Sequence, residues 1–356
     1  MTLPIDVPVD PMLAKSVPEV PEFGPKGGAL SYEPKWDGFR AIVWIDRDGD
    51  DEETTVEIGS RGSKLLTRYF PELVAAFRAQ FSVPCVIDGE IVVRRGQSGA
   101  ERLDWEALSQ RIHPAATRIN RLAVETPAAF IGFDLLALGD QSLLDAPFSV
   151  RRDALEQLLK DVEAPLHLSQ VTTDPEVARR WLFEFEGAGL DGVVAKLVDE
   201  PYLPGKRSML KIKHERTADA VVVGYRIHKS GAGVGSLLLG LYDESGELRG
   251  VGGSSAFSDA RRLELIDELA PLVKRDDDGN PVTGEGDRNR FSSSKDTSFV
   301  ILRPERVMEV RYDQMEGSRF RHTAQFLRWR PDREARSCTF EQLEVPAAYD
   351  LNEVLA

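Results

Sequence analysis

Cysteine is the residue type that this 356-residue sequence most nearly lacks, since only Cys85 and Cys338 are present. They lie far apart along the chain and have no paired cysteine or histidine neighbours. A disulfide framework needs several closely spaced cysteines, and a structural zinc site needs a set of Cys and His ligands. Both are therefore excluded, and any metal must be held by oxygen atoms.

Long apolar runs are missing as well. No segment approaches the roughly 18 consecutive apolar residues of a membrane-spanning helix. The first residues, MTLPIDV, lack the charged and apolar regions of a secretory signal. With 42% hydrophobic residues the chain can form globular domains, and its length favours two of them, at about 100 to 200 residues each. We expect a cytoplasmic protein with no membrane partner.

Positive charge is in short supply, because 45 lysines and arginines are outnumbered by 59 aspartates and glutamates. The formal net charge of -14 argues against a nucleic-acid partner, since such a field repels a polyanion. Screening beyond about 8 Å at physiological salt nevertheless lets DNA respond to local clusters. Two clusters are basic, Lys206, Arg207, Lys211, Lys213, His214 and Arg216, and Arg311, Arg319, Arg321, His322, Arg328, Arg330 and Arg333. Taken alone, such clusters are more often solvated faces of helices or strands.

A phosphate-binding loop of the Gly-x-x-x-x-Gly-Lys-Ser/Thr type is also absent from the sequence. The glycines at 231, 233 and 235 resemble a dinucleotide-binding fingerprint, but that motif must open a helix, and a strand pattern follows here. We interpret these glycines as a hairpin turn. If the chain uses a nucleotide, another device must hold it.

The pattern of apolar residues changes near residue 216. Before it, helical patterns at 65–81, 150–162 and 173–187 alternate with apolar strand patterns at 41–45, 83–93, 130–138, 192–198 and 209–213. After it come short strand patterns at 220–227, 236–242 and 248–252, a helix at 260–273 and an irregular loop at 275–291. We predict an α+β fold, with one domain at 1–216 and a small oligonucleotide-binding (OB-fold) β-barrel at 217–356.

The residues with the clearest chemical meaning are Lys35, Asp37 and Gly38, which form a Lys-x-Asp-Gly motif. At average residue usage this motif recurs by chance in roughly one chain of this length in ten, so alone it is weak. Further blocks follow it in a fixed order: Ser60-Arg61-Gly62, Asp88-Gly89-Glu90, Phe130-Ile131-Gly132-Phe133-Asp134, Leu190-Asp191-Gly192-Val193-Val194-Ala195-Lys196 and Leu210-Lys211-Ile212-Lys213.

Together these blocks resemble the covalent nucleotidyltransferase superfamily, and in particular the ATP-dependent DNA ligases of the bacterial repair type. The resemblance runs from residues 11–14 to residues 328–332. It implies a nucleotidyltransferase (adenylation) domain followed by the OB-fold barrel. It also implies a chain that joins AMP from ATP to Lys35, passes it to the 5′-phosphate of nicked duplex DNA, and seals the nick in DNA repair or recombination. The implied metal is Mg²⁺ or Mn²⁺, and the implied setting is a cytoplasmic, nucleoid-associated monomer with DNA-repair proteins as further partners.

The resemblance also implies roles for other nucleotide-binding residues. Glu33 meets the adenine edge, and Phe133 stacks on the base. Arg40 and Arg61 lie near the ribose and the nick phosphate, and Lys196 contacts phosphate. Arg328 and Arg330, in the terminal basic motif, orient the departing pyrophosphate after the barrel has swung over the nucleotide. The motifs depart from the family pattern where Asp191 replaces glutamate, Met209 replaces tryptophan and Arg333 replaces lysine.

The chemistry of a lysine nucleophile points to overlapping residues. A lysine attacks phosphorus only in its neutral form, so nearby cations, burial or a metal must favour the loss of its proton. Lys211 and Lys213 can supply that field and neutralise phosphoryl oxygens. A hard octahedral cation takes carboxylate and phosphate oxygens, and Glu90 and Asp191 are the candidate ligands. The shorter Asp191 leaves open a direct contact or one through water.

Other functions stay open at this stage. RNA ligases and mRNA-capping guanylyltransferases share the lysine chemistry, although residues 88–93 and 133–136 resemble the DNA branch more closely. An NAD-dependent ligase is disfavoured, because too few residues precede Lys35 for a nicotinamide-binding domain. A non-catalytic module that binds single strands needs exposed aromatic platforms, and residues 217–356 offer few aromatics.

Overall fold

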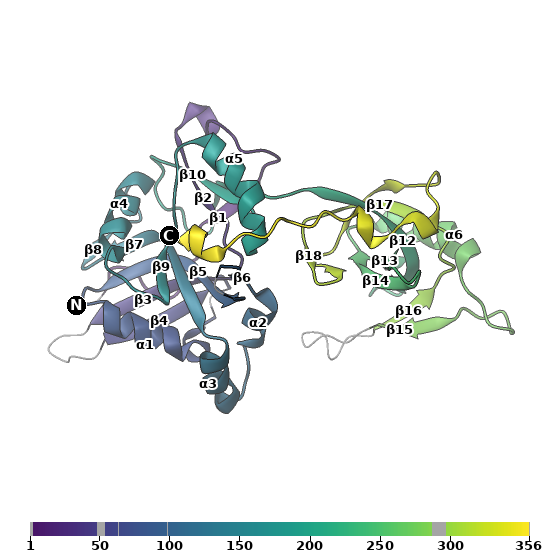
Figure 1. Ribbon diagram of the computed structural model, residues 1–356, viewed down its shortest axis with the longest axis horizontal. Helices are drawn as coiled ribbons and strands as arrows, with labels where there is room; N and C mark the ends of the chain where they lie inside the picture. The colour runs from purple at the N-terminus through teal and green to yellow at the C-terminus, as the bar shows by residue number, and fades with distance from the viewer. Residues whose placement is uncertain (1–2, 48–53, 63, 98, 287–296, 356) are drawn as a thin grey trace. The chain divides into compact units, whose positions relative to one another are not determined.

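The computed structural model describes residues 3–47, 54–62, 64–97, 99–286 and 297–355. The chain divides into two compact units, Met1–Lys213 together with Pro346–Ala356, and His214–Val345 (Figure 1). The first junction lies close to the predicted boundary between residues 216 and 217. The second junction differs from the prediction, because the last residues belong to the first unit, in whose core Leu351 and Val354 are buried. None of the helices in the described ranges is both long and apolar enough to cross a membrane.

A seven-stranded sheet forms the centre of the first unit. Its order is β4-β3-β5-β7-β8, with β6 paired to β5 and β9 paired to β7. The strands are β3 (Phe39–Arg47), β4 (Thr54–Ser60), β5 (Cys85–Arg95), β6 (Arg102–Leu103), β7 (Ala128–Leu138), β8 (Gln141–Ser142) and β9 (Leu166–Leu168). The apolar patterns at 41–45, 83–93 and 130–138 thus correspond to β3, β5 and β7. The antiparallel register of β3 and β5 places Arg40 opposite Glu90.

A second, four-stranded sheet in the first unit has the order β1-β11-β10-β2. Its strands are β1 (Leu13–Ser16), β2 (Leu30–Pro34), β10 (Val193–Leu197) and β11 (Arg207–Ile212). β2 and β10 run antiparallel, with Glu33 opposite Val194. This sheet therefore brings the segment before Lys35 beside the segment after Asp191, although the two lie far apart in the sequence.

The helices of the first unit are α1 (Pro71–Gln80), α2 (Trp105–Gln110), α3 (Ala116–Glu125), α4 (Phe148–Leu159), α5 (Pro175–Glu184) and α7 (Leu351–Leu355), with 3₁₀ turns η1 (Pro25–Gly27), η2 (Thr67–Tyr69) and η3 (Phe185–Ala188). Three of these helices, α1, α4 and α5, follow the predicted patterns with shorter bounds, and α2, α3 and α7 were not predicted. α1 begins later than predicted, because the backbone N–H of Leu66 donates to the Ile58 carbonyl at 2.7 Å in a strand-like pairing. α5 begins as predicted, since the Asp174 carboxylate caps it by accepting from the Glu176 N–H at 2.8 Å.

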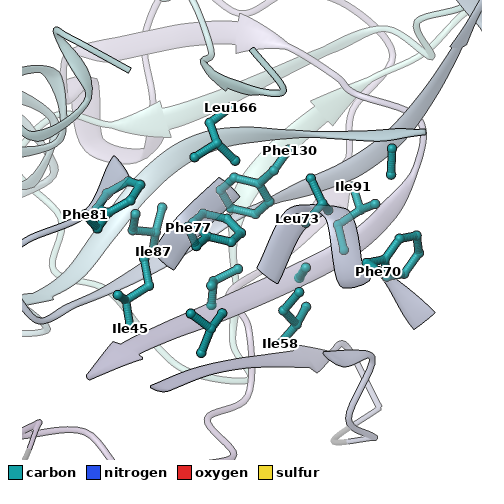
Figure 2. Packing of buried hydrophobic residues seen from close by; sticks show 14 of the residues in the cluster. Ile45, Ile58, Phe70, Leu73, Phe77, Phe81, Ile87, Ile91, Phe130 and Leu166 are labelled. Carbon is teal, nitrogen blue, oxygen red and sulfur yellow. The ribbon is translucent and has the colours of Figure 1, made fainter. Parts of the chain in front are cut away.

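The largest core of the first unit lies between α1 and the seven-stranded sheet, where Figure 2 shows the side chains interlocking. Phe77 of α1 meets Phe130 of β7 edge to face, with ring centres 5.2 Å apart. Both rings are fully buried. At about 2 kcal/mol for each large apolar side chain removed from water, this contact layer fixes α1 on the sheet.

The second unit is a curled antiparallel sheet with one helix. Its strands are β12 (Arg216–Ile227), β13 (Val234–Tyr242), β14 (Leu248–Ser254), β15 (Thr283–Glu285), β16 (Ser298–Ile301), β17 (Val307–Tyr312), β18 (Met315–Glu316), β19 (Arg319–Phe320) and β20 (Gln325–Trp329), and its helical segments are α6 (Asp259–Leu269), η4 (Ala270–Leu272), η5 (Ala335–Ser337) and η6 (Phe340–Gln342). The sheet curls because β12 pairs with β17 along its first half and with β16 along its second half. The α+β fold class is confirmed.

Two local predictions in the second unit have different outcomes. The glycine run is a turn, as predicted, because Gly231 and Gly233 have positive φ angles of 81° and 77° and β13 follows them directly. The irregular loop at 275–291 is wrong in part, because β15 lies within it and pairs with β16. Residues 287–291 of that prediction lie outside the described residues.

Arg111 is one of two arginines in the described part of the first unit that are fully buried. Its guanidinium donates to both carboxylate oxygens of Glu72, at 2.6 and 3.0 Å, and to the carbonyls of Tyr69 and Thr126, each at 2.9 Å. These contacts tie α1 to the ends of α2 and α3. A charge removed from water in this way is tolerated only while its partners stay in place.

Removing the Glu72 carboxylate should therefore destabilise the fold strongly. We expect Glu72→Ala to lower the free energy of unfolding by about 3 to 5 kcal/mol, because it leaves a buried guanidinium without its counter-charge. Urea denaturation measures the loss. The matched control is Glu125→Ala, because the exposed Arg121–Glu125 pair, at 3.5 Å, should contribute no more than about 1 kcal/mol. Equal losses in the two variants would contradict the expectation.

Candidate active site

Lys35 follows the end of β2 and is held by its own backbone. Its N–H donates to the Gly192 carbonyl at 2.9 Å, and its carbonyl accepts from the Asp191 N–H at 3.0 Å. The side chains of Lys35 and Asp191 are also in contact, because Lys35 Nζ lies 2.6 Å from Asp191 Oδ2. The structure thus brings together the predicted nucleophile and one of the two carboxylates that the sequence predicted as metal ligands.

Steric constraints explain why the last residue of the Lys-x-Asp-Gly motif, Gly38, is a glycine. A Cβ atom on Gly38 would lie 2.1 Å from the Ile91 carbonyl oxygen and 3.0 Å from Glu90 Cγ, so only glycine fits this close to β5. The Gly38 N–H also donates to Glu90 Oε1 at 3.2 Å. The close approach therefore ties Glu90, the second predicted carboxylate, to the segment that carries Lys35.

Further positive charge gathers around Asp191. Lys213 Nζ lies 2.7 Å from Asp191 Oδ2, the same oxygen that Lys35 contacts. Lys211, on β11, is half-buried, and burial together with the charges of Lys213 and Lys35 lowers its pKa. Two lysines thus contact one carboxylate, and Lys211 lies within electrostatic reach of all three groups.

Glu90 occupies a poorly solvated position on β5. Burial raises its pKa to about 7, although the charges of Arg40 and Lys35 oppose that shift. A carboxyl group in this state takes up or releases a proton near neutral pH, and a cation bound beside it favours the ionised form. Its environment is therefore suited to a ligand that brings positive charge.

Glu33 and Lys196 form a buried pair behind the lysine loop. Glu33 Oε1 lies 2.8 Å from Lys196 Nζ, and Lys196 also donates to the Phe133 carbonyl at 3.1 Å. Burial raises the pKa of Glu33, partly offset by Lys196. Among the described residues, no hydrogen bond reaches the buried Glu33 Oε2. A buried carboxylate oxygen in this state is suited to a donor from a bound molecule.

Arg40 is held by the carboxylate of Asp88, for which the sequence predicted no role. Its Nε and Nη2 each donate to Asp88 at 2.5 Å, and the Tyr202 hydroxyl donates to Asp88 Oδ2 at 2.6 Å. The guanidinium carbon lies 4.6 Å from the centre of the Phe133 ring, over which Lys196 Nζ also lies at 4.8 Å. Phe133 is itself buried, so both of its charged neighbours belong to the same packed cluster.

The remaining predicted residues are Arg61 in the first unit and Arg328 and Arg330 in the second. Arg61 is exposed, directly after Ser60, which pairs with Ala41 beside Arg40. In the second unit, Arg328 Nε donates to Glu309 at 2.5 Å and stays 65% exposed, so its guanidinium remains accessible. Arg330 is more enclosed.

Arg330 is held by two carboxylates of its own unit. Its Nη1 donates to both oxygens of Asp219, each at 3.0 Å, and its Nη2 donates to Asp332 at 2.8 Å. Arg333 Nε lies 3.5 Å from the same Asp219. In the second unit taken by itself, Arg328 and Arg330 thus both contact carboxylates.

The acidic residues suit a metal only in company with phosphate. No group of three or more His, Cys, Asp or Glu side chains in the described ranges could hold a metal ion without other ligands. Glu90 and Asp191, however, both lie beside the Lys35 segment. Mg²⁺ is commonly bound by one or two carboxylates together with substrate phosphates, so this donor set fits that mode.

Two residues of the site were missed from the sequence. Asp88 lies within the Asp88-Gly89-Glu90 block, but no role was predicted for it, and Tyr202 lies outside every motif block. The strand register could have suggested Asp88, because it lies two residues before Glu90, the cross-strand neighbour of Arg40. No local pattern marks Tyr202, which comes from the loop between β10 and β11.

The raised pKa of Glu90 has a consequence for stability. When the pKa of a carboxyl group is higher in the folded than in the unfolded state, the free energy of unfolding falls as pH rises from the ordinary carboxyl range through about 7. Glu90→Gln carries no charge and escapes this loss. We expect the variant to melt at a higher temperature than the parent protein at pH 8, with the gap closing towards pH 5, as measured by thermal denaturation across that range. A gap that widens towards pH 5 would contradict the assignment.

Comparison with known proteins agrees with this geometry. The family model "ATP dependent DNA ligase domain" matches residues 11–213, and "ATP dependent DNA ligase C terminal region" matches residues 230–333. The chain is 55% identical over 360 residues to DNA ligase C1 of Mycolicibacterium smegmatis, covering 100% of this chain and 99% of the relative. It is 53% identical over 370 residues to DNA ligase C of Mycobacterium tuberculosis, with the same coverage of 100% and 99%.

A solved structure from a study of Lig E DNA ligases shares the fold. It aligns with a TM-score of 0.55 at 17% identity, covering 90% of this chain and 99% of that chain. Both family models and the two full-length relatives lead to the same assignment that the motif order predicted. This chain belongs to the family of ATP-dependent DNA ligases.

Proposed function

We propose that this enzyme seals nicks in duplex DNA through an AMP adduct on Lys35. The observation that carries the proposal is the position of Lys35 Nζ, 2.6 Å from Asp191 and in a group of cations that includes Lys213. The two backbone hydrogen bonds between Lys35 and the Asp191–Gly192 segment form a clamp that holds the nucleophile in place before any substrate arrives. Such preorganisation is what phosphoryl transfer requires, because positioning and charge neutralisation supply most of its catalysis.

In the first step, Lys35 Nζ, which Asp191 holds in position, loses a proton to solvent. The freed nitrogen lone pair forms a bond to the α-phosphorus of ATP, and the bond from that phosphorus to the bridging oxygen breaks. Pyrophosphate leaves with the electron pair. Lys211 and Lys213 neutralise charge that develops on the phosphoryl oxygens.

Two transfers then complete the reaction. An oxygen of the 5′-phosphate at the nick attacks the phosphorus of the lysine adduct, the P–N bond breaks, and Lys35 recovers a proton from solvent. The 3′-hydroxyl then loses its proton to solvent and attacks the activated 5′-phosphate. The P–O bond to AMP breaks, AMP leaves with the electron pair, and the phosphodiester bond is formed. Arg40, fixed by Asp88, and the exposed Arg61 are proposed to hold the ribose and the nick phosphate, since guanidinium groups match phosphate geometry.

Recognition of adenine is proposed for the buried pair behind the lysine. The open Glu33 Oε2 can accept a hydrogen bond from the exocyclic amine of adenine, which guanine does not present in the same place. Phe133 is the proposed stacking partner of the base. Its ring is buried beneath Arg40 and Lys196, so a stacked base requires one of these cations to withdraw. Lys196 is the candidate for this move, consistent with its proposed phosphate contact.

A divalent cation, Mg²⁺ or Mn²⁺, is proposed to bind Glu90 and Asp191 together with phosphate oxygens. When bound, it neutralises negative charge on the transferring phosphoryl group. We further propose a monomeric, cytoplasmic, nucleoid-associated enzyme of DNA repair or recombination, with repair proteins as possible partners. The family assignment disfavours an RNA ligase or a capping enzyme, and a non-catalytic module leaves the Lys35 cluster without a purpose.

The nucleophile can be tested with α-labelled ATP. Lys35→Ala should form no covalent AMP, because no other lysine occupies the clamped position. Lys35→Arg should fail as well, since a guanidinium cannot lose its proton in a protein. The matched control is Lys160→Ala, a lysine that is 62% exposed, which should label as the parent protein does. Undiminished label on Lys35→Ala would refute the proposal.

The terminal arginines can be tested by separating the steps. If Arg328 orients pyrophosphate, Arg328→Ala should slow formation of the Lys35 adduct by about tenfold or more while sparing a nick that already carries 5′-AMP. Arg330→Ala should in addition lower the melting temperature, because it leaves Asp219 with fewer contacts. If the arginines bind DNA phosphates instead, sealing of the pre-adenylated nick should weaken, with a salt slope shallower by about one unit for each lost contact.

A further inference from the structure

The last residues of the chain are packed into the first unit, beside elements that precede them by some 160 to 250 positions. Leu351 and Val354 are 0% and 1% exposed. The Leu351 N–H donates to the Glu101 carbonyl at 2.9 Å. In Figure 1 the C-terminal helix α7 lies among the elements of the first unit rather than with the strands that come just before it in sequence.

The surface that receives this segment is shaped for it. A Cβ atom on Gly187 would lie 1.9 Å from the Ala347 carbonyl oxygen, so η3 can approach the segment only at a glycine. The Tyr349 ring lies with its centre 5.3 Å from that of Phe185, also in η3. The contact is therefore a fitted one, with backbone, aromatic and apolar components.

A short path leads from the docked segment to the nucleophile. The Gln170 side chain donates to the Val354 carbonyl at 2.9 Å. Its neighbour Ser169, which is fully buried, accepts from the indole N–H of Trp36 at 2.9 Å. Trp36 is the residue after Lys35, and it shares one hydrophobic cluster with Leu351 and Val354. The docked segment thus supports the loop that carries the lysine through one hydrogen-bonded path and one shared cluster.

We propose that residues 346–355 are a positioning element for Lys35. By completing the core under Trp36 and fixing the 169–170 segment, they hold the lysine loop in the geometry that attack on ATP requires. The inference rests on the proposed role of Lys35 as nucleophile. It predicts a defect confined to steps in which Lys35 reacts, because a small displacement of a reacting group costs rate without unfolding the protein.

The test uses the full chain with Leu351→Asp, which places a charge in the buried position and should release the segment. We expect the adduct on Lys35 to form about tenfold more slowly or worse, with the melting temperature lowered only modestly. Sealing of a nick that already carries 5′-AMP should stay near the parent rate, because Lys35 is not the nucleophile in that step. Hydrogen exchange at residues 346–355 reports whether the segment is released.

A second variant keeps the segment docked. Gln170→Ala removes only the hydrogen bond to the Val354 carbonyl and should slow adduct formation several-fold, with an unchanged melting temperature and normal sealing of the pre-adenylated nick. The matched control is Val345→Ala, at an 87% exposed position just before the segment, which should behave as the parent protein.

Several results would overturn the inference. Labelling at the parent rate by Leu351→Asp with a released segment is one, and labelling at the parent rate by Gln170→Ala is another. If Leu351→Asp loses both activities equally, Gln170→Ala decides, since a selective loss there supports the positioning role and an equal loss refutes it. Failure of the proposed function has a different signature, which is label on Lys35→Ala in the intact chain.

Discussion

The geometry of the site depends on two backbone hydrogen bonds, through which Lys35 and the Asp191–Gly192 segment hold each other. They extend the antiparallel pairing of β2 with β10 beyond the last residue of β2 and ahead of the first residue of β10. Because peptide groups are rigid and their hydrogen bonds directional, this clamp fixes where both side chains begin. The meeting of a lysine and a carboxylate separated by 156 positions thus follows from strand register.

Around that clamp, the protein stores charge in buried pairs. Lys196 with Glu33, Arg151 with Asp134, and Arg40 with Asp88 each remove ions from water, which is costly unless every partner is present. Apolar packing of the same volume could stabilise the fold as well. What the pairs provide is a set of charges held by their counter-charges in a poorly solvated region, where electrostatic interactions are stronger than in water.

Much of this was predictable from the sequence, and the rest was not for identifiable reasons. The Lys-x-Asp-Gly motif and the order of the later blocks indicated the family, the α+β class and the lysines around Asp191, because those features are local in the chain. Asp88 and Tyr202 escaped as site residues because their roles depend on pairing across strands and on a loop without a pattern. The return of residues 346–355 escaped because five helical residues carry too little periodicity to reveal what they pack against.

The return of the chain makes the second unit an insertion in the first, joined to it by two covalent connections instead of one. The two connections leave the second unit side by side, since Arg216 Nε lies 2.9 Å from Glu344 Oε2. When one unit turns about the axis that joins the two, the two connecting segments wind around each other. Each further turn shortens the distance that these segments can span. As long as α7 stays docked, any turning of the second unit must be reciprocating: it has to unwind along the path by which it came and cannot proceed as a rotation in one direction.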